Sequence, residues 1–190
     1  MLLVHGFVGR PGHFRGMQRA LHAAGRPTVA VDLKWAFRGV ASYGPPLADA
    51  IEAFDQVDIV AHSMGGVVAR KVLAERPDLR ARVQQVITLG TPHHGTESAR
   101  GLPPDFPRDI GDLQPDSPFL QQLPSLRELL PDRPLLAVAA QWDVVVFPLH
   151  RALPADMRQL VLPHLGHNGL LTEPEAYAAV LDQLGSSSAG

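Results

Sequence analysis

Residues 57–75 join a short apolar run to an amphipathic helix through a single sharp turn. The run is of the kind that makes a buried strand, and hydrophobic residues recur at helical spacing from Met64 onward. Ser63 lies between the two, with the small residues Ala61 and Gly65 two positions away on either side. Small residues there are typical of a strand-to-helix turn in which bulky neighbours would clash. The pattern predicts that the turn presents the Ser63 hydroxyl beyond the end of a sheet.

The alternation of strand and helix continues along the chain. Apolar or β-branched runs bounded by turn residues predict strands, and apolar residues at a period of 3.6 predict helices. We expect strands at residues 2–4, 28–33, 57–61, 83–89, 135–140 and 159–162. We expect helices at residues 14–24, 45–54, 64–75 and 176–184. This alternation predicts an α/β protein with about six parallel strands and helices on both faces of the sheet.

Residues 96–131 interrupt the alternation. The stretch is rich in proline and has room only for short helices, which we expect at residues 117–123 and 126–130. A loop this long inside a compact domain is typical of a lid or a binding element. We therefore interpret residues 1–185 as one domain with a proline-rich, lid-like insertion, followed by a mobile tail at residues 186–190.

The composition excludes several classes of protein. The chain has 190 residues, of which 45% are hydrophobic and 19% charged, as expected of a globular protein. The net charge of -2 and the absence of basic clusters argue against a surface for nucleic acid or anionic membranes. Because there are no cysteines, disulfides, thiolate metal sites and a cysteine nucleophile are excluded.

The sequence also bears on the cellular location. No apolar run approaches the ~20 residues that a membrane helix needs, so we expect no integral membrane segment. The first residues lack a basic region followed by a long apolar core, which predicts that there is no signal peptide. On this sequence we expect a cytoplasmic protein, or a secreted one if an upstream leader has been removed.

Three reactive residues follow expected strands. Ser63 follows the third strand, Asp143 the fifth and His167 the sixth. Parallel α/β sheets place their sites at the carboxyl ends of the strands, so these side chains are expected to meet at one edge. The chain order serine, acid, histidine is the order of the α/β-hydrolase fold.

Other residues compete for two of these roles. Asp132 and Asp156 also lie near expected strand ends, and Asp143 could instead cap the segment that follows it. His150 and His164 are alternatives to the histidine at 167. The setting Gly166-His167-Asn168-Gly169, together with its distance from the strand end, favours His167.

The chemistry of a serine nucleophile requires each of these groups. His167 would accept the proton of Ser63 during attack and return it to the leaving group. Asp143 would hold the tautomer of the imidazole and stabilise the imidazolium. The developing oxyanion needs fixed donors, for which we expect the backbone N–H groups of Met64 and Phe7.

Four motifs resemble known bacterial lipases. Ala61-His62-Ser63-Met64-Gly65-Gly66 resembles the nucleophile elbow of small lipases of the Bacillus type, and Val4-His5-Gly6-Phe7 is similar to their oxyanion loop. Leu89-Gly90-Thr91-Pro92-His93-His94-Gly95 and Gly166-His167-Asn168-Gly169-Leu170-Leu171 resemble segments of bacterial triacylglycerol lipases. The resemblance implies a minimal α/β-hydrolase fold that acts on carboxylic esters, and the proline content of residues 96–131 departs from the small lidless lipases.

The hypothesis from sequence is a serine carboxylic-ester hydrolase, an esterase or lipase, that works through an acyl-enzyme on Ser63. Its partner would be a small-molecule or lipid ester, with no cofactor, and we expect a monomer. An acyltransferase with the same three residues and a non-catalytic binding protein of the same fold are the alternatives. Side chains that could line an acyl pocket are Phe7, Phe14, Met64, Trp142, Val144, Val145, Phe147, Leu165 and Leu170.

Four further histidines lie in the motifs. His5 and His62 are interpreted as residues that pack the loops beside the site, and His93 and His94 as residues that shape the loop after the fourth strand. Their spacing does not match a zinc site with a clear fourth ligand, so we expect no metal.

Overall fold

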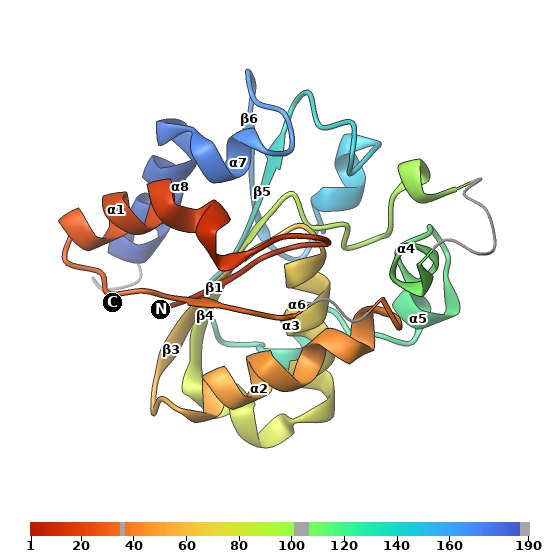
Figure 1. Ribbon diagram of the computed structural model, residues 1–190, viewed down its shortest axis with the longest axis horizontal. Helices are drawn as coiled ribbons and strands as arrows, with labels where there is room; N and C mark the ends of the chain where they lie inside the picture. The colour runs from red at the N-terminus through yellow and green to blue at the C-terminus, as the bar shows by residue number, and fades with distance from the viewer. Residues whose placement is uncertain (35–36, 101–106, 187–190) are drawn as a thin grey trace.

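The computed structural model describes residues 1–34, 37–100 and 107–186. Within these ranges the strands form one six-stranded, fully parallel sheet in the order β2-β1-β3-β4-β5-β6 (Figure 1). The strands are β1 (Leu2–Val4), β2 (Val29–Val31), β3 (Val57–His62), β4 (Val83–Leu89), β5 (Leu135–Ala140) and β6 (Arg158–Leu162). The expected parallel α/β architecture is confirmed, and each strand lies within two residues of its expected bounds.

The register of the sheet brings the loops that follow the strands together. Val4 pairs with Ala61, His62 with Leu89, and Leu89 with Val138. The carboxyl ends of the four central strands therefore lie at one edge of the sheet. Ala140 also pairs with Leu162, so the loop after β6, which carries His167, begins at the same edge as the loops that carry the other candidate site residues.

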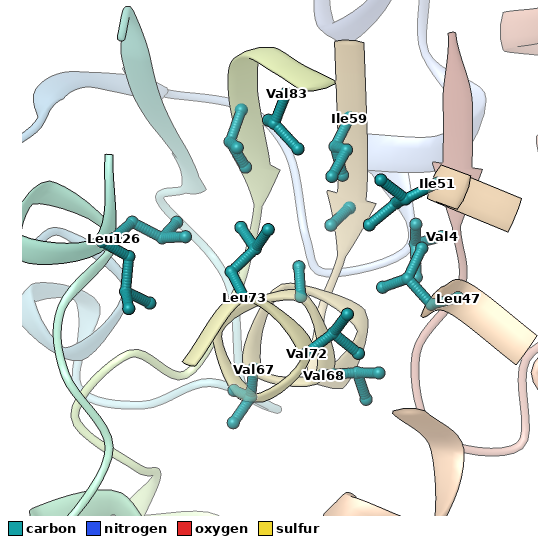
Figure 2. Close-up of a cluster of buried hydrophobic side chains, with 14 of the residues drawn as sticks. Val4, Leu47, Ile51, Ile59, Val67, Val68, Val72, Leu73, Val83 and Leu126 are labelled. Atoms are coloured by element: carbon teal, nitrogen blue, oxygen red, sulfur yellow. The ribbon is translucent and has the colours of Figure 1, made fainter. Parts of the chain in front are cut away.

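Helices cover both faces of the sheet. Figure 1 shows α1 (Arg15–Ala23), α7 (Gly169–Thr172) and α8 (Pro174–Ser186) on one side, and α2 (Gly44–Glu52) and α3 (Met64–Glu75) on the other. Each face has its own buried hydrophobic cluster. In the cluster of Figure 2, the side chain of Leu73 lies on the side of α3 that faces Ile59 and Val83 of the strands, and Val67 lies on the far side of the helix. Burial of these apolar stripes supplies the driving force that fixes α3, and with it the turn at its N-terminus.

The proline-rich insertion folds into short helices where it is described. They are η4 (Glu97–Ala99), α4 (Arg108–Asp112), α5 (Pro118–Gln121) and α6 (Leu126–Leu129). Ser125 and Glu128 form a capping box at the start of α6, which explains why so short a helix begins there. The helices expected near residues 117–123 and 126–130 are confirmed. Residues 101–106 of the insertion, and residues 187–190 of the expected tail, lie outside the described part of the chain.

Several 3-10 helices were not expected from the sequence. They are η1 (Pro11–Phe14), η2 (Val40–Tyr43), η3 (Pro77–Arg82) and η5 (Leu149–Ala152). Such turns are too short to show a hydrophobic period, and only η1 and η3 begin with a proline that hints at them. In the described ranges, no helix is both long enough and apolar enough to cross a bilayer.

Candidate active site

Ser63 occupies a strained turn between β3 and α3. Its backbone has φ 55° and ψ −131°, a conformation that costs free energy for a residue with a side chain. Hydrogen bonds hold the turn in place: the Ser63 N–H donates to Leu89 O at 2.8 Å, and the Thr91 hydroxyl donates to Ser63 O at 2.9 Å. This is the geometry of a nucleophile elbow, in which the serine side chain projects at the end of the sheet.

The glycines after Ser63 are required by close packing. A Cβ added to Gly65 would lie 2.6 Å from the carbonyl oxygens of both Val4 and His5. A Cβ added to Gly66 would lie 2.2 Å from the hydroxyl of Thr91. The first turn of α3 therefore sits directly against the end of β1 and the loop after β4, which sharpens the turn as the sequence pattern predicts.

Asp143 and His167 form a buried pair. His167 Nδ1 lies 2.7 Å from Asp143 Oδ2, and the two side chains are 9% and 3% exposed. The other carboxylate oxygen, Oδ1, accepts hydrogen bonds from the backbone N–H groups of Val145 (2.9 Å) and Val146 (2.8 Å). Because a carboxylate only accepts hydrogen bonds, the proton of the neutral ring lies on Nδ1 and Nε2 is left as an acceptor.

The loop after β4 lies close to both Ser63 and this pair. Leu89 O accepts the N–H of Ser63, and the next residue is Gly90, with φ +57°. A Cβ on Gly90 would lie 3.2 Å from both Asp143 Oδ2 and His167 Nδ1. The described part of the chain contains no hydrogen bond between Ser63 Oγ and the His167 ring, a contact that in such sites often tightens only when substrate is bound.

His62 and His5 pack the loops beside the site, as interpreted from the sequence. The His62 ring lies 4.6 Å from the ring of His167, and its Nε2 is 3.2 Å from His167 O. Two causes lower the pKa of His62 to about 3, of which burial is the larger and the nearby His167 is the second. The His62 ring is therefore neutral, and its Nε2 donates to His167 O. His5 accepts the N–H of Leu33 at 3.2 Å and contacts Gly6 O at 3.0 Å, and burial lowers its pKa.

The loop after β1 lies against the nucleophile. A Cβ on Gly6 would be 2.6 Å from Ser63 Cβ and 3.1 Å from Ser63 Oγ, so only glycine fits there. The following residue is Phe7, whose ring meets that of Phe37 edge-to-face at 5.9 Å. Met64 is the first residue of α3, so its N–H is not used by the helix. Both expected oxyanion donors therefore belong to backbone that flanks Ser63.

Four side chains expected to line a pocket are instead in the core. Phe14, Met64 and Leu170 are 0% exposed and Leu165 is 7% exposed. Met64 belongs to the cluster that contains the α3 side chains, and the other three belong to the cluster on the opposite face of the sheet. The sequence could not separate pocket residues from core residues among these candidates, and burial assigns these four to the core.

Four of the five remaining pocket candidates lie close to Asp143 in the chain and are exposed. Trp142, Val144, Val145 and Phe147 have exposed fractions of 68%, 80%, 46% and 55%. Large apolar side chains that lie next to one another in water are unusual unless they contact an apolar partner. They form an apolar surface beside the candidate acid.

Sequence reasoning missed a buried arginine. Arg70 is 6% exposed, and its guanidinium donates to the carbonyl oxygens of Pro124 (3.1 Å), His93 (2.8 Å) and Leu123 (2.8 Å). Burial lowers its pKa to about 10, so it stays charged at neutral pH. It ties α3 to the loop after β4 and to the proline-rich insertion. The only signal in the sequence was a charged residue on the apolar face of a helix.

His93 and His94, which follow β4, are not part of a group of side chains that could bind a metal ion in the part of the chain that the structure describes. His93 is buried, its Nε2 contacts the Thr88 hydroxyl at 3.0 Å, and burial lowers its pKa well below the usual value. His94 is exposed. Among the described residues, no group of three or more histidine or carboxylate side chains is placed to hold a metal ion.

Comparisons with known proteins agree on the fold. Residues 43–100 match a family described as a PGAP1-like alpha/beta domain; this range contains β3, Ser63, α3 and β4. Triacylglycerol lipases from Pseudarthrobacter phenanthrenivorans and Burkholderia plantarii are each 42% identical over 55 residues, or 29% of this chain. The match spans only 15% and 13% of those two lipases.

Two solved structures are similar over nearly the whole chain. Aspergillus fumigatus lipase B has a TM-score of 0.81 at 19% identity, covering 95% of this chain and 51% of the lipase. Bacillus licheniformis lipase BlEst2 has a TM-score of 0.78 at 17% identity, covering 96% of this chain and 90% of that lipase. With the parallel sheet and the strand–serine–helix turn, these likenesses show that the chain has the α/β-hydrolase fold. Because that fold hosts many activities, the activity itself must be argued from the site.

Proposed function

We propose that the protein is a serine carboxylic-ester hydrolase that uses Ser63 as nucleophile, His167 as general base and Asp143 as the acid that orients it. The observation that carries the proposal is the buried pair of His167 and Asp143 at 2.7 Å, which lies against Gly90, the residue after the carbonyl that accepts the N–H of the strained Ser63 turn. Elsewhere in a protein, a buried pair of an acid and a histidine can serve only to stabilise the fold. Beside a serine elbow at the carboxyl edge of a parallel sheet, it supports catalysis.

The geometry supports a two-step mechanism. His167 donates to Asp143 from Nδ1, so its Nε2 is free to take the proton of Ser63 as Oγ attacks the ester carbonyl. The N–H groups of Met64 and Phe7 would stabilise the oxyanion, and the protonated His167 would then give its proton to the leaving alcohol. In the second step His167 takes a proton from water, which attacks the acyl-enzyme. His167 then returns the proton to Ser63 as the carboxylic acid product is released. Each step needs only groups of this chain.

A lipid ester is the substrate class that the surroundings favour. The exposed side chains of Trp142, Val144 and Phe147 lie close to Asp143 in the chain, and the partly buried Phe7 follows Gly6, which lies against Ser63. Such surfaces gain free energy by contact with acyl chains, at roughly 25 cal/mol per Å² of apolar area removed from water. The lipases named among the relatives and structural neighbours support the same substrate class.

The test is a chain-length profile with p-nitrophenyl esters from acetate to palmitate, with Ser63→Ala as the control. We expect the rate constant kcat/KM to rise from acetate toward the longer acyl chains, and the control to lose turnover by roughly 10³-fold or more while staying folded. A maximum at acetate would contradict the lipid substrate. Unchanged activity of Ser63→Ala would contradict the nucleophile.

A further inference from the structure

The loop that carries the candidate acid has little side-chain packing of its own. We call residues 143–147 the acid loop. Of the four side chains that follow Asp143, those of Val144, Val145 and Phe147 are exposed by 80%, 46% and 55%, whereas Val146 is 1% exposed. A loop with one buried anchor needs hydrogen bonds to hold a single conformation.

Those hydrogen bonds come from the start of the proline-rich insertion. The Thr96 hydroxyl donates to Val145 O at 2.8 Å and accepts the N–H of Phe147 at 3.0 Å. Ser98 Oγ donates to the same Val145 O at 2.5 Å, and the N–H of Glu97 donates to Phe147 O at 2.8 Å. Thr96 is only 6% exposed, so its two bonds are shielded from competing water.

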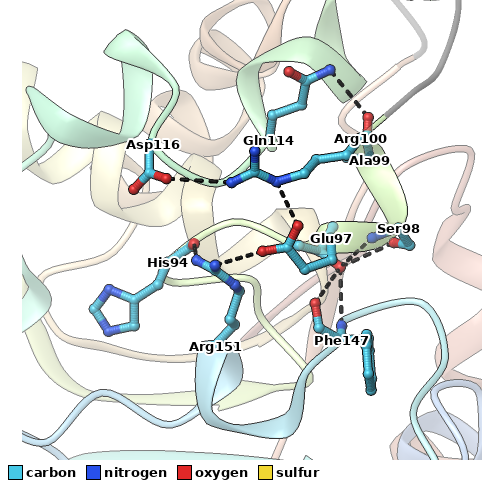
Figure 3. A network of polar contacts seen from close by, with 10 residues as sticks. His94, Glu97, Ser98, Ala99, Arg100, Gln114, Asp116, Phe147 and Arg151 are labelled. Atoms are coloured by element: carbon cyan, nitrogen blue, oxygen red, sulfur yellow. Dashed lines mark hydrogen bonds and ion pairs between the residues drawn. The ribbon is translucent and has the colours of Figure 1, made fainter.

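The insertion is itself fixed by a chain of ion pairs. Figure 3 shows the Glu97 carboxylate between two arginines, Arg151 at 2.7 Å and Arg100 at 2.5 Å, with Arg100 continuing to Asp116 at 3.4 Å. Arg151 also donates to His94 O at 2.7 Å. Arg151 is 18% exposed, which makes its pair with Glu97 the least solvent-screened member of the chain. Thr96 is therefore followed directly by a residue, Glu97, that is held by two ion pairs.

The acid loop transmits this support to the carboxylate. Asp143 Oδ1 accepts the N–H groups of Val145 and Val146, and these two bonds fix the rotation of the carboxylate about its side chain. Thr96 binds Val145 and Phe147, the residues on either side of Val146. Loss of the Thr96 hydroxyl would leave the N–H of Phe147 without its partner and would loosen the turn on which Oδ1 depends.

We propose that Thr96 is a positioning residue for Asp143, and that the first residues of the proline-rich insertion brace the candidate acid. The inference rests on the proposed function, because it assumes that Asp143 orients His167 in catalysis. It extends that function because residues 96–98 would hold the acid loop in place. This role does not require them to act as a lid over Ser63. A small displacement of a catalytic group can cost up to about a hundredfold in rate.

The test compares Thr96→Val, which keeps the shape and removes the hydroxyl, with Thr96→Ser, which keeps the hydroxyl. For Thr96→Val we expect kcat on a p-nitrophenyl ester to fall about tenfold to a hundredfold with KM changed less than about twofold. We also expect the acidic limb of the pH–rate profile to move to lower pH, because a displaced carboxylate stabilises the imidazolium less. Thr96→Ser should restore both to near the wild-type values. Should Thr96→Val not fold, Thr96→Cys, whose thiol is a weaker donor, takes its place with the same expected pattern.

Thr88→Val is the matched control. Thr88 is also a buried threonine with two polar contacts, to His93 and Leu136 O, but it does not touch the acid loop. It should lower the melting temperature and leave the pH–rate profile in place. The positioning role is overturned if Thr96→Val is destabilised like Thr88→Val but keeps nearly full kcat and an unchanged acidic limb of the pH–rate profile. That result would leave the esterase activity of the wild type standing. A wild type that neither hydrolyses esters nor reacts at Ser63 would instead overturn the proposed function itself.

Discussion

Replacing Asp143 with asparagine tests how the His167 ring is oriented. Asp143 Oδ1 is held by two backbone N–H groups at 2.9 Å and 2.8 Å, and Oδ2 faces His167 Nδ1 at 2.7 Å. An amide has one acceptor oxygen and one donor NH₂ group. The oxygen must stay with the two N–H donors, so the NH₂ group must face Nδ1.

This arrangement forces the wrong tautomer. Facing a donor, His167 Nδ1 becomes an acceptor and the ring proton moves to Nε2, which can then no longer take the proton of Ser63. The negative charge that stabilises the imidazolium is lost as well. For Asp143→Asn we expect kcat to fall by roughly 10³- to 10⁴-fold, or about 4 to 5.5 kcal/mol of transition-state stabilisation at about 1.36 kcal/mol per tenfold.

Asp143→Ala supplies the comparison. Alanine removes the charge but imposes no donor, so the His167 ring can adopt either tautomer. We expect Asp143→Ala to lose about tenfold less activity than Asp143→Asn. The assay is kcat on a p-nitrophenyl ester, with circular dichroism to show that both variants are folded. An asparagine variant within tenfold of wild type, or one more active than the alanine variant, would refute the reasoning.

Three other outcomes follow from the packing and the buried charges. Gly65→Ala places a methyl group 2.6 Å from two carbonyl oxygens of the first strand and its loop, and should sharply lower the melting temperature. In Gly111→Ala of α4 the added methyl group meets nothing within 4 Å, so this variant should be neutral or stabilised by up to about 1 kcal/mol. Differential scanning fluorimetry gives both melting temperatures, and a lower melting temperature for Gly111→Ala than for Gly65→Ala would contradict both expectations. Arg70→Met leaves three carbonyls without their donor and should cost about 2 to 4 kcal/mol in urea denaturation, with little recovery in Arg70→Lys; a loss below about 1 kcal/mol would count against this network. Because the pKa of His62 is about 3 in the folded chain and near 6.5 in the unfolded one, the unfolded state takes up the proton first, and the free energy of unfolding should fall as pH is lowered from about 6.5 toward 3. His62→Gln should flatten that slope by up to about 1.4 kcal/mol per pH unit, and an unchanged slope would contradict a buried neutral ring.

The parts that could be predicted from sequence are those specified locally. Ser63 could be placed because a strand, a turn and a helix follow one another within residues 57–75, and small neighbours mark the turn. Asp143 and His167 could be nominated because each follows an expected strand, and the order of parallel strands brings those loops to one edge. The 2.7 Å contact between Asp143 and His167 depends on the register of β5 and β6, which cannot be predicted from a local sequence pattern.

The parts that could not be predicted depend on side-chain direction or on distant partners. Met64 and Leu170 lie next to candidate site residues at the starts of α3 and α7, yet both side chains are buried in the core. Arg70 makes its hydrogen bonds with carbonyls 23 to 54 residues away, and Thr96 with a carbonyl 49 residues away. Such contacts have no period and no fixed spacing, so only the folded chain reveals them.

Covalent labelling of Ser63 is the most direct test of the catalytic proposal. The folded wild-type protein is treated with a fluorophosphonate, and the site of modification is found by mass spectrometry of its peptides. We expect one adduct, on Ser63, that is absent in Ser63→Ala and forms far more slowly in His167→Ala, because the serine hydroxyl is a weak nucleophile without its base. A folded protein that forms no adduct, or that reacts equally fast without His167, would contradict the assignment of Ser63 and His167 as nucleophile and base.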